Sequence, residues 1–443
     1  MKLWEKGIET DKKIETFTIG RDRELDVYLA PFDVIGSLAH IQMLQSINLL
    51  SKDDLAILTR ELKHIYKEIR EGNFQIEDNV EDVHSQVELT LIRRLGEVGK
   101  KIHSGRSRND QVLLDLKLFI RNEIMELIPM VKGLFDILIT QSEKYKKILL
   151  PGYTHMQIAM PSSFGLWFGA YAESLTDDMH LLQAAFKVAN QNPLGSAAGY
   201  GSSFPLNRSM TAELLGFESL NYNVVYAQMS RGKTEKCTAW AISSIAATLG
   251  KLATDICQYN SQNFRFVLLP DHLTTGSSIM PHKKNPDVFE LIRAKCNKIQ
   301  ALPNEITMIT TNLSSGYHRD LQVIKESFIP ALEELKACLD ITHMAISQMK
   351  VKENILEDPR YKYLFSVDAV NTEVLKGVPF REAYQKIAKE IADGSYEDIK
   401  SVNHTHEGSI GNLCNQDIIK KWEAVVNGFH TEKIQRAMKN LTE

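Results

Sequence analysis

A segment over residues 274–290, T-T-G-S-S-I-M-P-H-K-K-N-P-D-V-F-E, holds residue types that could act on a carboxylate-bearing substrate. Gly276 gives the backbone freedom beside the hydroxyls of Ser277 and Ser278. Serines can move protons, Lys283 can hold negative charge, and a glycine-containing loop can close over a substrate. The alternative is a polar surface loop that leads into an ordinary helix, since Gly-Ser-Ser stretches are common in loops.

A helix is expected to begin directly after this loop. Asn285 suits the N-cap position, Pro286 the first helical position and Asp287 the first turn. The apolar spacing then continues as a helix, with Glu290 about one turn inside it. The sequence therefore predicts a mobile serine loop joined to a rigid helix.

Arginines and neutral polar residues gather over residues 103–111, H-S-G-R-S-R-N-D-Q. Arg106 and Arg108 can bind carboxylates through two parallel hydrogen bonds, and Ser107 and Asn109 can add neutral ones. The competing interpretation is a helix start with a serine cap and surface arginines. The residues alone leave both interpretations open.

A histidine in the segment 150–157, L-P-G-Y-T-H-M-Q, is a candidate proton-transfer group. Because histidine titrates near neutral pH, His155 could act as an acid or a base. A lone histidine in such a turn is more often a structural hydrogen-bonding group. A carboxylate from Glu290 facing His155 would raise the pKa of the imidazole and fix its tautomer.

The last polar cluster covers residues 314–326, S-S-G-Y-H-R-D-L-Q-V-I-K-E. Gln322 and Lys325 are three residues apart and are expected to share a helix face, with Tyr317 in the preceding turn. Taken alone, this pattern is also that of an ordinary amphipathic helix start. All four clusters stand at the ends of long helical patterns, where a bundle would gather them.

The elements that would position these clusters are five long helices. Apolar residues recur with helical spacing over 110–147, 161–190, 231–263, 286–312 and 319–350. Such helices are about 45 Å long at roughly 1.5 Å per residue, which exceeds the usual three or four turns. They cannot all bury their apolar faces within one chain of this size, so we expect a bundle that continues into partner subunits.

Shorter helices flank this bundle, including predicted ones over 52–70 and 80–96. No central sheet is expected, and the G-x-G at Gly199 and Gly201 follows a helix, so a dinucleotide cradle is not indicated. The predicted organisation is all-α, in three domains: an N-terminal helical domain over 1–106, the central long-helix bundle over 107–352 and a small C-terminal helical domain over 353–443.

Composition excludes several classes of protein. The chain has 443 residues, of which 43% are hydrophobic and 24% charged, as in a soluble globular protein. A formal net charge of −4 argues against a nucleic-acid partner. Apolar runs are too short for a membrane span and no secretory core is evident, so a cytoplasmic location is expected. The five scattered cysteines suggest neither disulfides nor a zinc site, and His404 and His406 lie in a glycine-punctuated segment that favours structural roles over a metal site.

The polar clusters together resemble one enzyme family. G-S-S-I-M-P-H-K-K-N-P-D resembles the signature loop of the fumarase/aspartase/argininosuccinate lyase superfamily. H-S-G-R-S-R-N-D-Q-V, P-G-Y-T-H-M-Q, N-P-L-G-S-A-A and Y-H-R-D-L-Q-V-I-K-E occur with it, and the set is most similar to the argininosuccinate lyases. This resemblance implies an all-α, three-domain fold, a homotetramer with a twenty-helix core, and active sites built from three subunits. It also implies cleavage of argininosuccinate into arginine and fumarate, the last step of arginine biosynthesis, without a metal or organic cofactor.

The resemblance also implies roles for individual residues. Ser277 is the expected base, supported by Lys283, and His155, paired with Glu290, is the expected acid. The expected binding residues are Asp82, Ser107, Arg108, Asn109, Thr154, Asn285, Tyr317, Gln322 and Lys325. Among these, Gln322 and Lys325 suit the amino-acid end of the arginine moiety.

The chain departs from the family pattern at several positions. Ile158 and Met160 stand where Arg and Gln are usual, and Val87 replaces a customary Asn. In M-S-R-G-K, Arg231 matches the family's S-D-R-D, but both acids are absent, with Ser230 and Gly232 in their places. Thr18 stands where a substrate-binding serine is common. These changes concern supporting contacts and substrate detail.

Three alternatives to this assignment remain open from the sequence. A lyase could release fumarate from another N-succinyl compound, such as adenylosuccinate, and a nucleotide should then bind. A non-catalytic structural relative, as some lens crystallins are, would retain the fold without turnover. A purely structural helical scaffold would be indifferent to replacement of Ser277.

Overall fold

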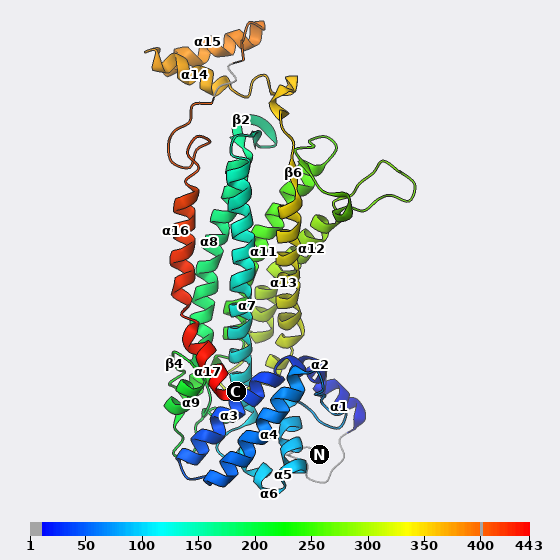
Figure 1. Ribbon diagram of the computed structural model, residues 1–443, viewed down its shortest axis with the longest axis vertical. Coiled ribbons are helices and arrows are strands. Elements are labelled where there is room, and N and C mark those ends of the chain that lie inside the picture. Colours follow the sequence, from blue (N-terminus) through cyan, green and yellow to red (C-terminus); the bar gives the residue numbers. More distant parts are fainter. Residues whose placement is uncertain (1–10, 399–401) are drawn as a thin grey trace.

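The computed structural model describes residues 11–398 and 402–443, and its centre is a bundle of five long helices (Figure 1). The predicted long helices are confirmed, with ends that shift by a few residues: α7 (Arg108–Lys144), α8 (Phe164–Ala189), α11 (Lys233–Asn260), α12 (Asp287–Thr310) and α13 (Ile324–Gln348). The last pattern begins later than expected, because residues 319–322 form a 3-10 turn, η4 (Arg319–Gln322), before α13 starts.

One apolar core runs the length of this bundle. α11 packs along α12 and α8, and α7 packs along α8 and α13. Their inward faces carry aliphatic and aromatic side chains such as Leu127, Leu175, Ile245 and Phe328, all buried in a single cluster. Burial of these faces stabilises helices whose isolated stability in water would be marginal.

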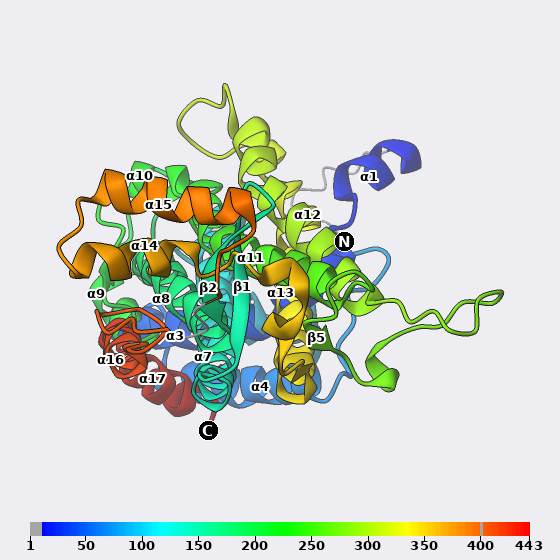
Figure 2. The same cartoon turned by 90° about the horizontal axis from the view of Figure 1, so that it is seen from above.

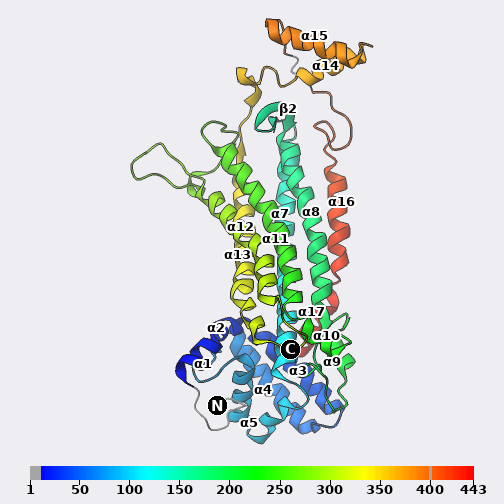
Figure 3. The same ribbon diagram turned by 180° about the vertical axis from the view of Figure 1, so that it is seen from behind.

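The N-terminal helices form a second core at one end of the bundle (Figure 3). This base contains α1 (Lys12–Ile19), α2 (Asp22–Leu25), η1 (Asp26–Tyr28), α3 (Ala30–Ser46), α4 (Lys52–Arg70), α5 (Val83–Leu95), α6 (Glu97–Lys100) and η2 (Lys101–His103). The predicted helix over 52–70 is confirmed at both ends. Ser51 and Asp54 form a capping box at its start, and the chain turns at Gly72, where φ is +75°.

The C-terminal ninety or so residues divide between two places. After η5 (Ile355–Glu357) and η6 (Pro359–Tyr361), α14 (Ser366–Leu375) and α15 (Phe380–Asp393) form a small cluster of their own beyond the far end of the bundle (Figure 1). α16 (Asn415–Val426), η7 (Asn427–Phe429) and α17 (Glu432–Thr442) return along the bundle to the base. Trp422 of α16 stacks on Phe135 of α7, with ring centroids 4.3 Å apart. The expected C-terminal unit is therefore compact only over α14 and α15, and the three-domain division stays a prediction.

Strands in the described part of the chain are few, and they pair only in twos. β1 (Leu149–Thr154) pairs antiparallel with β2 (Gln157–Ser163), β3 (Gln191–Asn192) pairs parallel with β4 (Ser219–Leu220), and β5 (Val267–Leu268) pairs antiparallel with β6 (Lys350–Val351). Short helices α9 (Arg208–Leu214), α10 (Val224–Met229) and η3 (Asp271–Leu273) complete the described elements. Over the described residues there is no central sheet, as predicted.

Over residues 11–398 and 402–443, no single helix is both long and apolar enough to cross a membrane. One bent pair, Asp22–Tyr28 with Ala30–Ser46, meets the length and composition criteria across a 64° break.

Candidate functional site

A polar cavity of about 160 Å³ lies where the N-terminal base meets the end of the bundle. It brings together six of the residues predicted to bind substrate, from the start of α5, the start of α7 and the η4–α13 junction. These residues are Asp82, Arg108, Asn109, Tyr317, Gln322 and Lys325. The lining also includes residues that the sequence did not mark as binding residues, namely Asp22, Asp26, Glu81, His84, Val112, Arg231 and Arg319.

The start of α7 carries the G-R-S-R-N-D motif into this cavity. Ser107 is the N-cap: its hydroxyl accepts the N–H of Asn109 (3.3 Å), and its own N–H donates to Asp110 (2.8 Å). The other oxygen of Asp110 accepts the N–H groups of Gly195 (3.0 Å) and Ala197 (2.9 Å). The predicted serine cap is thus confirmed, but the arginines are not surface residues, since Arg106 donates to Ser37 (2.9 Å) and Arg108 lines the cavity. Asp110 joins the N-P-L-G-S-A-A loop to the helix start. Arg108 and Asn109 follow the cap in the first turn and line the cavity.

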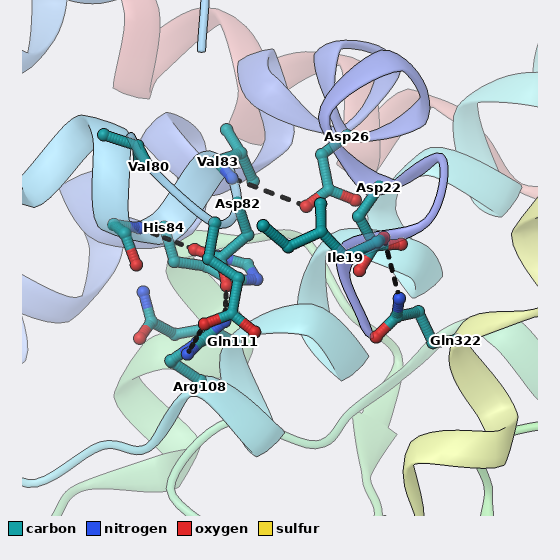
Figure 4. A network of polar contacts seen from close by, with 12 residues as sticks. Ile19, Asp22, Asp26, Val80, Asp82, Val83, His84, Arg108, Gln111 and Gln322 are labelled. Atoms are coloured by element: carbon teal, nitrogen blue, oxygen red, sulfur yellow. Dashed lines mark hydrogen bonds and ion pairs between the residues drawn. The ribbon is translucent and has the colours of Figure 1, made fainter. Parts of the chain in front are cut away.

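Arg108 forms an ion pair with Asp82, the N-cap residue of α5, and donates to Glu81 (3.2 Å) (Figure 4). Glu81 also accepts from Arg319 (2.7 Å), so it bridges the base and η4. Burial would raise the pKa of Glu81, but the two arginines outweigh burial and lower it. One wall of the cavity therefore holds the carboxylates of Glu81 and Asp82 against the guanidinium groups of Arg108 and Arg319.

The opposite wall holds a buried ammonium group. Lys325 donates to Asp22 (2.7 Å) and Asp26 (2.6 Å), which are four residues apart and extend from consecutive turns of α2 and η1. Burial would lower the pKa of Lys325, but the two aspartates outweigh burial and raise it. Burial raises the pKa of Asp22 to about 6, although Lys325 acts against that rise. In the sequence, the four-residue spacing of Asp22 and Asp26 in R-D-R-E-L-D was the signal that could have identified these two aspartates as neighbours of Lys325.

Gln322 binds the N-terminal segment at the same wall of the cavity. Its amide donates to the carbonyls of Thr18 and Ile19, both at 3.0 Å, while Arg319 also donates to Thr18 (2.9 Å). The hydroxyl of Thr18 bonds to the carbonyl of Ile14 within its own helix (2.9 Å). Thr18 thus contributes its backbone here, whereas Tyr317 stays partly exposed in the loop that precedes η4.

His84 adjoins the cavity and belongs to a buried charge cluster. Its Nδ1 lies 2.7 Å from Asp33 and 3.4 Å from Asp115. Burial would raise the pKa of Asp33 and lower that of His84, but their mutual attraction reverses both shifts; the pKa of Asp115 is raised by burial and by Asp33. Among the described residues these three form the one group spaced to hold a metal, with donor atoms within 4.8 Å. His84 and nearby Arg106 attract the carboxylate of Asp33 and so offset the effect of its burial.

His155 lies at the tip of the β1–β2 hairpin, at the end of the bundle remote from the cavity (Figure 1). Thr154 and Gln157 pair across a two-residue turn in which His155 and Met156 have φ of +53° and +61°. This left-handed turn normally favours Asn and Gly, and other residues there carry backbone strain of about 1–3 kcal/mol each. Thr154 and His155 are both exposed. Strained exposed tips of this kind are often functional.

The serine loop projects from the side of the bundle between β5 and α12 (Figures 1 and 2). Thr275 and Asn285 form an antiparallel bridge at its neck, with N–H to O distances of 3.2 and 2.8 Å. Within the loop, the hydroxyl of Ser277 accepts the N–H groups of Met280 (3.1 Å) and Ile279 (3.4 Å). The side chain of Lys283 is exposed. The loop thus exists as predicted, closed at its neck and open to solvent.

The predicted cap of α12 was wrong by one residue. Pro286 is the N-cap and Asp287 the first helical residue, because the backbone of Asn285 is committed to the bridge with Thr275. Glu290 lies one turn into α12, as expected, but its side chain is exposed. Over the described part of the chain, no hydrogen bond or ion pair joins it to His155.

Most departures from the family pattern lie away from the cavity. Ile158 and Met160 are partly exposed on β2, beside the hairpin tip, and Val87 is buried in the base cluster. Arg231 is buried at the cavity wall, where it bonds to Glu235. Glu235 thus supplies a carboxylate to Arg231 although neither neighbour of Arg231 is acidic.

A single chain therefore places the predicted site residues in three regions. The cavity at the base holds one group, the hairpin tip a second, and the serine loop with the start of α12 a third. Ser277, His155 and Lys325 come from these three different regions.

Comparisons with known proteins define the class. A family described as "Lyase" matches residues 4–301. The fold resembles that of EDDS lyase in complex with formate, with a TM-score of 0.76 and 20% identity over 98% of this chain and 94% of that chain. It also resembles a class II fumarase from Schistosoma mansoni, with a TM-score of 0.72 and 16% identity over 86% of this chain and 88% of that chain. The chain has the helical lyase fold and belongs to this lyase family.

The sequence relatives narrow the class further. The argininosuccinate lyase of Parabacteroides distasonis is 63% identical over 441 residues, covering 99% of each chain. That of Bacteroides fragilis is 64% identical over 440 residues, covering 99% of this chain and 98% of its relative. That of Thermotoga neapolitana is 38% identical and covers 88% of this chain and 98% of its relative. Within the lyase family, the chain belongs to the argininosuccinate lyases.

Proposed function

We propose that this protein cleaves argininosuccinate into arginine and fumarate, the last step of arginine biosynthesis. The observation that carries the proposal is 63–64% identity to argininosuccinate lyases over almost the whole chain. The polar cavity at the base, lined by acids and bases in comparable number, suits a substrate with both carboxylates and cationic nitrogen groups. The proposed compartment is the cytoplasm, which cell fractionation would test.

The proposed chemistry is a β-elimination. A base removes a proton from the carbon beside one succinyl carboxylate, and the electron pair is first delocalised onto that carboxylate. The pair then forms the carbon–carbon double bond, the bond to the guanidinium nitrogen breaks, and that nitrogen takes a proton. The site must therefore supply a base, charge stabilisation and an acid.

Ser277 is the proposed base. A free hydroxyl is a poor base at neutral pH, so its ionised form needs local support. The N–H groups of Met280 and Ile279 point to the Ser277 oxygen, and Lys283 adds a positive charge in the same loop. His155, oriented by Glu290, is the proposed acid.

The remaining residues are proposed to hold the two ends of the substrate. Ser107, Asn109, Thr154, Lys283 and Asn285 would bind the succinyl carboxylates. Gln322 and Lys325 would bind the amino-acid end of the arginine moiety, and Asp82, Arg108 and Tyr317 would complete the site.

We further propose a homotetramer in which three subunits build each site. The support is the separation of the three groups within one chain, together with large apolar side chains exposed along the long helices. These side chains are Leu181, Trp240, Leu291, Met308 and Met344. Exposed apolar surface of this kind is typical of subunit interfaces.

The test is fumarate release, followed by ultraviolet absorbance, from argininosuccinate and separately from adenylosuccinate. Release from argininosuccinate alone, with arginine in equal amount, is the expected result. Release from adenylosuccinate alone, or from neither substrate, would overturn the proposal.

A further inference from the structure

Arg231 occupies the turn between α10 and α11, and its side chain reaches the wall of the polar cavity. It is buried, and its Nε donates to Glu235 at 3.0 Å. Its Nη2 donates to the backbone carbonyl of Leu321 at 3.1 Å. The guanidinium therefore connects the start of α11 with η4, the segment that carries Gln322.

The turn itself is tightly packed. Glu235 accepts the N–H of Gly232 (2.8 Å) with its second oxygen and so closes the start of α11. Gly232 has φ of +77°, and a Cβ there would lie 2.7 Å from the methyl group of Thr310 and 3.2 Å from Leu321. Because of this close packing, Arg231 has little freedom to shift relative to η4.

Because η4 contacts the cavity residues, a restraint on η4 also restrains the positions of those residues. Leu321 is followed by Gln322, which holds the N-terminal segment, and Lys325 lies one turn further on between Asp22 and Asp26. The positive charge of Arg231 also affects the pKa of Asp22. Burial raises the pKa of Asp22 to about 6, and the positive charges of Lys325 and Arg231 act against that rise.

We infer that Arg231, held by Glu235, is a positioning residue for the arginine end of the substrate, because it fixes the Leu321 carbonyl and thereby the Gln322–Lys325 segment. The inference rests on the proposed function, in which Gln322 and Lys325 bind the amino-acid end. Arg231 itself touches no reacting atom in this account. It should therefore affect binding of arginine and leave binding of fumarate unchanged.

The test compares the two products as inhibitors of Arg231→Lys and Glu235→Gln. Loss of one charge-assisted hydrogen bond is expected to raise the inhibition constant of arginine and the KM for argininosuccinate about tenfold. The inhibition constant of fumarate and kcat should change less than about twofold, since the succinyl end and the reacting groups are untouched. Glu235→Gln keeps Arg231 and the size of the side chain but loses one of the two hydrogen bonds that Glu235 accepts, from Arg231 and Gly232, so it serves as the second variant if Arg231→Lys fails to fold.

Arg121→Lys is the matched control. Arg121 is also buried and donates to a backbone carbonyl, that of Leu215 (2.7 Å), but it does not line the cavity. This variant should lower the melting temperature and leave the arginine inhibition constant unchanged. Equal weakening of both products, or an unchanged arginine constant in folded Arg231→Lys and Glu235→Gln, would overturn the inference.

Calorimetric titration with arginine separates this inference from the proposed function. Wild-type protein that binds arginine but releases no fumarate from argininosuccinate would contradict the proposed function. The ratio of arginine affinities between wild type and variants would still decide the inference: a tenfold loss supports it, and no loss overturns it.

Discussion

At the scale of a single residue, Ser277 is a weak base that needs neighbouring groups to stabilise its ionised form. The backbone N–H groups of Met280 and Ile279 donate to its oxygen, as donors to a developing negative charge would. We predict that Ser277→Ala lowers kcat by about 10²–10⁴-fold, the usual contribution of a positioned proton-transfer group. Steady-state fumarate release measures this. Ser395→Ala, in an exposed loop after α15, is the control and should behave as wild type. Near-normal turnover in folded Ser277→Ala would remove serine from the role of base.

Asp22 gives a prediction about pH at the same scale. Burial raises its pKa to about 6, so it gains a proton as the pH falls through 6 and then no longer pairs as an anion with Lys325. We expect kcat/KM of the wild type to fall about tenfold per pH unit below that point, because kcat/KM reports groups of the unliganded enzyme. Asp22→Asn should have a lower plateau and lack this acid limb. The same limb in the variant would assign the titration to another group.

At the scale of elements, the start of α7 depends on one buried carboxylate. Asp110 accepts N–H groups from Ser107, Gly195 and Ala197, so Asp110→Ala leaves three donors without a partner. We expect a loss of about 2–3 kcal/mol in stability and a melting temperature lower by several degrees in calorimetry. Asp136→Ala, which breaks an exposed ion pair with Lys132 on the same helix, should change stability by less than about 1 kcal/mol. Equal effects of the two substitutions would refute this account of the cap.

The long helices could be predicted from the sequence because their signals are local. Apolar spacing defines α7 and α11 within a few residues, although α7 contains Pro129. The return of α16 to the bundle could not be predicted in this way, because it depends on Trp422 finding Phe135 almost three hundred residues earlier in the chain. The prediction of the α12 N-cap was wrong for a related reason. A bridge between Thr275 and Asn285 overrode the local preference for Asn at an N-cap.

At the scale of the whole molecule, motif matching predicted which residues belong together but not where they lie. The cavity gathers Asp82, Arg108 and Lys325 from distant parts of the chain. Its acids Asp22 and Asp26 were missed, since their role depends on Lys325 packing between them. The catalytic roles of Ser277 and His155 stay predictions, since one chain keeps the two residues in different regions.

The assembly itself is a prediction at this scale. We expect a homotetramer, so sedimentation equilibrium should give about four times the chain mass of 50.2 kDa. Leu291→Glu and Met308→Glu place charges on exposed apolar positions of α12 and should weaken association. Glu61→Gln, on α4 in the base, should leave the mass unchanged. A monodisperse monomer with full activity would contradict the shared-site account.

The most direct test mixes subunits of Ser277→Ala and His155→Asn, each nearly inactive alone. If each site takes its serine and its histidine from different chains, random exchange at equal ratio restores about a quarter of the sites. Fumarate release should then rise to roughly that fraction of the wild-type rate, after exchange has been verified with differently tagged subunits. Activity no higher than that of the better parent in verified mixed tetramers would contradict the account.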